Sequence, residues 1–267
     1  LQGDWSSDVC SSDLGEKKKH SEVMKTLELP PLDEGMQKKY RSLTMRAAFL
    51  AQDRPDIAET TKCLARHMKT PNEAAFNDLK RLVRYLRGRP RLVYEYWPQR
   101  YQRELTTYCD SDHAGCLITR RSTTGLITML GAHNIKHSSN IQSTISLSSG
   151  ESEYYAIVKA AAVSLSIQAL MADWGLTVSL KVKSDSSAAR GTSQRQGLGS
   201  TRHIETRYLW VQEKIQRKAF ALEKVSTNSN DSDICTKPLP EAALDKHLRS
   251  MHLKFSTEKA SGAKQLV

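Results

Sequence analysis

The spacing of apolar residues changes near residue 102 and divides the chain into two parts. Apolar positions first recur at helical spacing and then alternate with polar ones, as in strands. In the first part the pattern predicts helices over 36–51, 56–68 and a segment capped by Thr70. In the second part it predicts strands over 104–112, 122–130, 134–139, 178–184 and 220–225, and helices over 151–174, 186–193, 203–218 and 240–251, with a short helix around Ser232. This order indicates an α/β fold, with five strands flanked by helices, after a small helical segment.

Residues 1–14 differ in composition from the rest of the chain. They contain no Lys or Arg, although the 267 residues include 40 of these. The segment resembles a translated sequencing adapter, so we expect an artefactual leader without function and exclude it from fold reasoning.

The remaining composition points to a globular protein with a polyanionic partner. The formal net charge is +11, which favours nucleic acid, and 39% of the residues are hydrophobic, which is enough for a packed core. The five cysteines show no zinc-binding spacing and are expected to be reduced thiols in an intracellular protein. No uncharged apolar run approaches the roughly 18 residues of a membrane helix, so we expect no membrane partner.

Four acidic residues stand at informative places: on the first strand, in the first turn of the long helix, at the end of the fourth strand and in the late short helix. They are Asp110, Glu153, Asp185 and Asp233. Taken singly, each has an ordinary explanation as a helix cap or a solvated turn residue. Taken together, clustered carboxylates repel one another unless a cation lies between them, and oxygen ligands favour Mg²⁺ or Mn²⁺. Two such ions can hydrolyse a phosphodiester, but the residues alone leave the convergence of the four acids open.

Six sequence blocks in one order are spread over half of the chain: Tyr108–Gly115, Arg121–Gly125, Leu147–Tyr154, Lys183–Ala188, Thr201–Glu205 and Ser232–Leu239. They resemble the ribonuclease H domain of copia-type (Pseudoviridae) retrotransposon Pol polyproteins. The resemblance implies a ribonuclease H-like mixed five-stranded sheet and hydrolysis of the RNA strand of RNA–DNA hybrids during reverse transcription. It implies that the catalytic, metal-binding carboxylates are Asp110, Glu153, Asp185 and Asp233, and that they hold two Mg²⁺ or Mn²⁺ ions.

The resemblance also chooses between neighbouring acids. Glu153 fits the family's Glu-x-x-Ala helix start, which leaves Glu151 to a capping box with Ser148. Asp110 precedes a small residue in mid-strand, as the family's first carboxylate does, and Asp112 remains the runner-up.

Two further positions depend on the same comparison. Asp233 is preferred to Asp231 because it directly precedes the Ile-x-Thr-Lys-Pro-Leu run. His113 stands where family members usually have Trp, and we expect a packing change with a partly buried imidazole.

Hydroxyl and basic side chains near these blocks are candidates for contact with the hybrid: Ser111, Ser148, Ser149, Lys136, Arg202 and His203. Serines could read 2′-hydroxyls, and basic residues could bind phosphates in a salt-dependent way. For His203, a core or hydrogen-bonding role is an equal alternative.

The upstream part resembles the end of the family's reverse transcriptase in three stretches: Tyr40–Leu43, Arg54–Ala58 and Leu79–Gly88. We therefore expect a helical thumb- or connection-like remnant over 15–100, the ribonuclease H domain over 101–240, and a terminal helix with a polar tail over 241–267. The polymerase's Asp-Asp motif is absent from the sequence, so no polymerase activity is expected. The expected partners are an RNA–DNA hybrid and the remainder of the Pol polyprotein, in a cytoplasmic virus-like particle or in the nucleus.

Two rival functions share these features. A decayed copy would bind hybrid without cutting it. A strand transferase of the transposase or integrase type shares the sheet and the acidic metal site, but it uses three acids, usually with Glu last. An early Glu153 followed by two aspartates fits ribonuclease H better.

Overall fold

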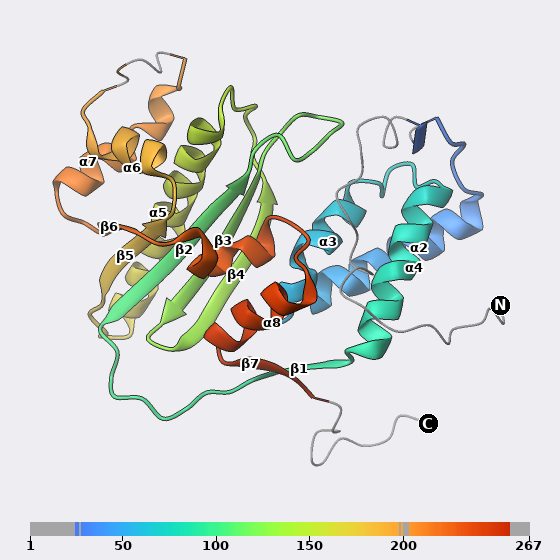
Figure 1. Ribbon diagram of the computed structural model, residues 1–267, viewed down its shortest axis with the longest axis horizontal. Helices are drawn as coiled ribbons and strands as arrows, with labels where there is room; N and C mark the ends of the chain where they lie inside the picture. Colours follow the sequence, from blue (N-terminus) through green and yellow to red (C-terminus); the bar gives the residue numbers. More distant parts are fainter. Residues whose placement is uncertain (1–24, 27, 198, 200–202, 257–267) are drawn as a thin grey trace.

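The computed structural model describes residues 25–26, 28–197, 199 and 203–256. Within them a mixed five-stranded sheet has the order β4-β3-β2-β5-β6 (Figure 1). Its strands are β2 (Glu104–Asp112), β3 (Thr123–Leu130), β4 (His133–Ile141), β5 (Ser179–Ser184) and β6 (Ala221–Lys224). The hairpin strands β2, β3 and β4 pair antiparallel, whereas β5 and β6 are parallel to β2 and to each other. The predicted fold class is confirmed. The leader expected over residues 1–14 lies outside the described residues.

Helices cover both faces of the sheet (Figure 1). One face carries α5 (Ser149–Asp173), α6 (Ser187–Gln194) and α7 (Trp210–Gln216). The other carries α2 (Glu34–Leu50), α3 (Pro55–Ala65), α4 (Glu73–Gly88), the 3₁₀ turn η4 (Asp231–Cys235) and α8 (Glu241–Ser250). Two short 3₁₀ turns, η2 (Thr206–Tyr208) and η3 (Thr227–Ser229), lie in the connections.

Strand β3 separates two hydrophobic cores. Successive side chains of a strand point to opposite faces, so Leu126 packs against α5 while Ile127 and Met129 pack among the helices of the other face. All three side chains are buried. The helical segment and the sheet therefore share a core.

A small antiparallel sheet that the sequence did not predict lies beside the core that contains Ile127 and Met129. Its strands are β1 (Arg91–Tyr94) and β7 (Leu253–Ser256). No strand was expected at either place, and after the helix over 240–251 only a polar tail was expected. Leu253 is buried in this core. The strand pair ties the segment after α8 to the connection between α4 and β2 (Figure 1).

The long helix α5 begins with a cap that the sequence predicted. The Ser148 hydroxyl accepts a hydrogen bond from the Glu151 amide at 3.2 Å, and the Glu151 carboxylate accepts one from the amide of Leu147 at 2.9 Å. The helix ends before Gly175, whose φ of +75° suits glycine. By length and composition alone, α5 could cross a membrane. This stretch was not predicted from uncharged runs, because Lys159 interrupts it. Its buried residues pack against β2, β3 and β5.

Two local predictions were wrong. The cap of α4 is Asn72, whose side-chain oxygen accepts the amide of Ala75 at 3.0 Å, and not Thr70. The helix predicted over 203–218 is only η2 followed by α7, and at the end of η2 the carbonyl of Tyr208 accepts the Tyr154 hydroxyl at 2.8 Å.

Candidate metal centre

Three carboxylates from separate elements meet at one edge of the sheet. One oxygen each of Asp110, Glu153 and Asp185 lies within 4.8 Å of the other two. Strands β2 and β5 are parallel, with Tyr108 beside Lys183, so two residues further on Asp110 comes beside Asp185. The first turns of α5 bring Glu153 to the same place, where its carboxylate accepts the amide of Ser111 at 3.2 Å. The structure thus brings together three of the four acids singled out in the sequence.

The three carboxylates of this group repel one another, and the group itself contains no positive charge. Burial, followed by the proximity of Asp110 and Asp185, raises the pKa of Glu153 to about 9. Burial and the charge of Asp233 raise the pKa of Asp110 to about 6. In addition, Oε2 of Glu153 is buried and has no hydrogen-bond partner among the described residues. A hard divalent cation would relieve the repulsion and use this oxygen, so the donor set fits Mg²⁺ or Mn²⁺.

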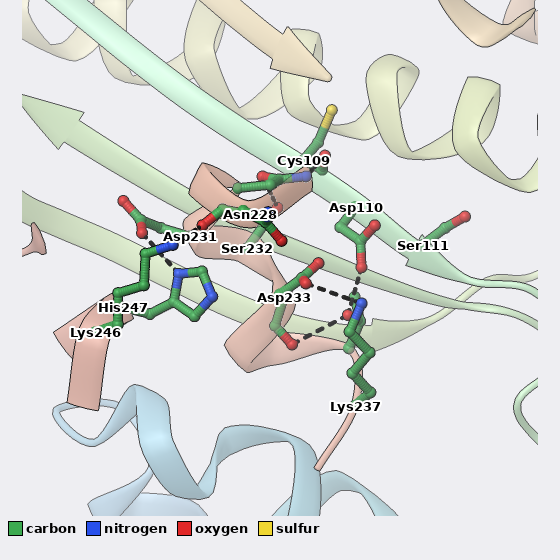
Figure 2. Close-up of polar contacts among 12 residues, drawn as sticks. Cys109, Asp110, Ser111, Asn228, Asp231, Ser232, Asp233, Lys237, Lys246 and His247 are labelled. Atoms are coloured by element: carbon green, nitrogen blue, oxygen red, sulfur yellow. Dashed lines mark hydrogen bonds and ion pairs between the residues drawn. The ribbon is translucent and has the colours of Figure 1, made fainter. Parts of the chain in front are cut away.

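Asp233 lies beside this group but is not one of the three. From η4 its carboxylate pairs with Nζ of Lys237 at 2.9 Å (Figure 2). Burial opposes the charge of Lys237, but the hydrogen bond to Asp233 and the nearby Asp110 outweigh it and raise the pKa of the lysine. The second oxygen of Asp233 is buried without a hydrogen-bond partner among the described residues. Asp233 therefore contacts a cation of the protein and keeps one free acceptor.

Thr236 connects η4 to the three carboxylates. Its hydroxyl donates to Oδ2 of Asp110 at 2.5 Å and lies 3.2 Å from the carbonyl oxygen of Asp233. Neither Thr236 nor Lys237 was predicted as a site residue, although both lie in the run after Asp233 that distinguished it from Asp231. Their spacing could have indicated them. Thr236 and Lys237 are three and four positions after Asp233, and residues at these spacings on a helical turn lie on the same side as the first residue.

The runner-up acids have other partners. Asp112 is not part of the three-carboxylate group, and its side chain turns towards Gly115 in the loop after β2. Asp231 accepts hydrogen bonds from the Ser250 hydroxyl at 2.7 Å and faces Nδ1 of His247 at 2.9 Å (Figure 2). Both acids are thus directed away from the group.

The serines predicted to contact substrate lie near the carboxylates in different settings. Ser111 donates its hydroxyl to Ser152 at 2.9 Å, so this hydroxyl is already engaged. The oxygen of Ser148 caps α5, and Ser149 is exposed at the first position of that helix.

The basic and imidazole candidates are more scattered. Lys136 is exposed on β4, opposite Thr128, away from the strand ends that hold the carboxylates. His203 faces the carboxylate of Glu151 at 2.8 Å, which fits the hydrogen-bonding alternative. Arg202 lies outside the described residues. His113 is exposed, so the expected partly buried imidazole is wrong.

Gly125 of β3 lies beside Asp110 and allows η4 to approach the sheet closely. A Cβ atom there would lie 2.7 Å from the carbonyl oxygen of Ser232 and 3.0 Å from Cβ of Cys235. We expect Gly125→Ala to displace η4 and lower the free energy of unfolding by about 1–3 kcal/mol, measured by denaturant titration. Gly191→Ala is the control, since nothing lies within 4 Å of that position. Equal stability of the two variants would contradict the close approach.

Comparison with known proteins gives the site its context. No family model matches the chain. It is 29% identical over 203 residues to the retrovirus-related Pol polyprotein from transposon TNT 1-94 of Nicotiana tabacum, covering 74% of this chain and 15% of that protein. With the Pol polyprotein from transposon RE1 of Arabidopsis thaliana it shares 30% identity over 207 residues, covering 76% and 14%. The chain is a homologue of copia-type retrotransposon Pol polyproteins. It spans about a seventh of the length of these copia-type relatives.

Shorter relatives and solved structures overlap this chain in part. It is 38% identical over 125 residues to the uncharacterized mitochondrial protein AtMg00810 of Arabidopsis thaliana, which is 46% of this chain and 51% of that protein. Among solved structures, LC11-RNase H1 aligns with 55% of the chain at 17% identity and a TM-score of 0.37, over 99% of its own length. The N-terminal RNase H domain of rv2228c from Mycobacterium tuberculosis aligns with 55% at 14% identity and a TM-score of 0.32, over 97% of its length. The fold assignment rests on the observed strand order and directions.

Proposed function

We propose that this chain contains the ribonuclease H of a copia-type Pol polyprotein, which hydrolyses the RNA strand of RNA–DNA hybrids during reverse transcription. The observation that carries the proposal is the meeting of Asp110, Glu153 and Asp185 at the sheet edge. The Pol homologues and the net charge of +11 support a nucleic-acid substrate. The products would carry 5′-phosphate and 3′-hydroxyl ends. The reaction would take place in a cytoplasmic virus-like particle or in the nucleus.

In this proposal the three grouped carboxylates hold divalent metal ions, and Asp233 supplies a fourth carboxylate beside them. Bound Mg²⁺ or Mn²⁺ ions would activate the attacking water and stabilise the departing oxygen. The protein's part is to fix its own ligands. The Thr236 hydroxyl orients Asp110, and the amide of Ser111 orients Glu153. Lys237 holds Asp233 until a metal or a phosphate competes for either partner.

A second candidate function is binding of the hybrid without cleavage. It is favoured by one observation, the ion pair that keeps Asp233 with Lys237 and outside the group of three. The two functions differ in whether metal ions support hydrolysis.

A cleavage assay separates them. We expect the purified chain to cut the RNA of a labelled RNA–DNA hybrid with Mg²⁺ or Mn²⁺ and to cut nothing in EDTA. Asp185→Asn should lower the cutting rate at least about a hundredfold, because one metal-ligand charge contributes several kcal/mol and 1.4 kcal/mol is tenfold. Hybrid binding measured in EDTA should stay unchanged.

The matched control is Asp173→Asn, which makes the same change at the exposed far end of α5 and should cut at the wild-type rate. Wild-type protein that binds the hybrid tightly but never cuts it would establish the binding function instead. Metal-independent cutting, or equal cutting of duplex DNA, would reject the ribonuclease H proposal.

A further inference from the structure

A cavity of about 520 Å³ lies between the helical segment and the loop that joins β2 to β3. One wall comes from the end of α3 and the start of α4, including Arg66 and Asn72. The opposite wall comes from the loop residues Thr119 and Arg121 and from Ile141 at the end of β4. The cavity is therefore built by both parts of the chain, and neither part forms it alone.

The charged side chains that line this cavity are basic, and they lie among the apolar Leu29, Pro31, Ile118 and Ile141. Arg66, His67 and Arg121 contribute to it, and none of the described residues that line it is acidic. Thr70 and Thr119 add hydroxyl groups. Guanidinium groups, an imidazole and hydroxyls are hydrogen-bond donors suited to the oxygens of a phosphate. This chemistry is the opposite of that at the carboxylates.

One buried residue, Cys116, contacts the guanidinium of Arg66 and the backbone of Arg121. Its amide donates to the carbonyl of Arg121 at 3.1 Å, and its sulfur accepts from Nη2 of Arg66 and from the amide of Thr119. The loop and α3 are thus fixed relative to each other without a ligand. The guanidinium of Arg66 is therefore fixed in advance, and a donor fixed in this way loses little entropy when it binds an anion.

The cavity opens at the same edge of the sheet as the carboxylates. Thr123 pairs with Ile141 on one side and with Asp112 on the other, and Asp110 comes two residues before Asp112 in β2. Two strand spacings and two residues of rise place Ile141 about 12 Å from Asp110. Phosphates follow one another every few ångströms along a nucleic-acid strand, so one strand or its complement can reach both places.

We propose that this cavity binds a backbone phosphate of the RNA–DNA hybrid, a few nucleotides from the bond that is cut. The inference rests on the proposed function, since it concerns the same substrate. It gives the helical segment a role of its own, because Arg66 and His67 belong to that segment. The phosphate could belong to the RNA strand or to the DNA strand.

The test is hybrid binding by the full chain in EDTA at several salt concentrations. Arg121 is exposed, so Arg121→Ala should leave the fold intact. We expect its affinity for an RNA–DNA hybrid to fall about tenfold, the loss of one charge-assisted contact. The slope of log K against log salt should decrease in magnitude by about one, as one phosphate contact is removed. Arg66→Gln should behave in the same way, and Arg66→Lys should retain most of the affinity.

The matched control is Arg46→Ala, which removes the same charge from an exposed position of α2 that does not line the cavity. Its salt slope should stay within experimental error of wild type. The strand is identified by hybrids with one neutral methylphosphonate at successive positions of the RNA or the DNA. A methylphosphonate that lowers the affinity of the wild-type protein for the hybrid should not lower the affinity of Arg121→Ala.

The outcomes separate this inference from the function on which it rests. Wild-type affinity and salt slope in both Arg121→Ala and Arg66→Gln, with hybrid binding intact, would overturn the phosphate site alone. Absence of hybrid binding by the wild-type chain would overturn both.

Discussion

Replacing Asp110 by Asn is expected to lower the rate of hybrid cleavage about a thousandfold, which corresponds to about 4 kcal/mol. Asn keeps the shape of the side chain and an oxygen that can accept the Thr236 hydroxyl. It removes the negative charge that a divalent ion requires. The measurement is single-turnover cleavage of a labelled hybrid at saturating protein, so that binding does not limit the rate.

The control for this experiment is Asp112→Asn, the same change two residues further along β2. Asp112 shares the strand face of Asp110 but lies outside the three-carboxylate group, so its rate should stay within about threefold of wild type. The reverse result, with Asp112→Asn inactive and Asp110→Asn active, would move the metal centre to the end of the strand.

Replacing Glu153 by Gln is expected to stabilise the metal-free protein and to abolish its stabilisation by Mg²⁺. Gln removes a carboxylate that is buried against Asp110 and Asp185 and that has one unsatisfied oxygen. We expect a gain of about 1–3 kcal/mol in the absence of metal, which is about 2–10 °C in melting temperature. In wild type, Mg²⁺ at a hundred times its dissociation constant should add about 2.7 kcal/mol, and the variant should lack this gain.

The same substitution should change how stability depends on pH. The pKa of Glu153 is raised in the folded protein from 4.5 to about 9, so the folded state binds this proton more tightly than the unfolded state. Its contribution is therefore fully present below about pH 4.5 and is lost as the pH rises towards about 9. Metal-free wild type should lose stability across this range, and Glu153→Gln should lose less. Thermal melts in EDTA from pH 5 to pH 9 measure this, and a variant less stable than wild type throughout would contradict the repulsion in the site.

The parts of the fold that follow from local pattern could be predicted. Strand β2 has the predicted bounds because its residues alternate between the two sheet faces, and Ser148 caps α5 as the sequence indicates. Strands β1 and β7 could not be predicted, since each has four residues and each is a strand only because the other lies beside it. Contacts between residues more than 150 positions apart leave no period in the sequence.

The candidate site shows the same division. Asp110, Glu153 and Asp185 could be predicted to converge, because their sequence blocks carry the family resemblance and because parallel strands end at one edge of the sheet. The ion pair of Asp233 with Lys237 could not be predicted, because both oxygens of an aspartate on a short turn have several possible partners. The basic cavity was also missed. Its arginines come from two loops whose approach depends on the buried sulfur of Cys116.

The shared core beneath β3 limits how the five-stranded sheet could be moved between genes. Ile127 and Met129 on the sheet, and Ile234 on η4, are covered by helices that precede residue 101 or follow residue 240. A proteolytic cut or a recombination breakpoint at either border would leave this apolar surface bare and prone to aggregation. The sheet and its flanks are therefore expected to fold and to be transferred as one unit, in which the strand pair β1 and β7 joins the two flanks.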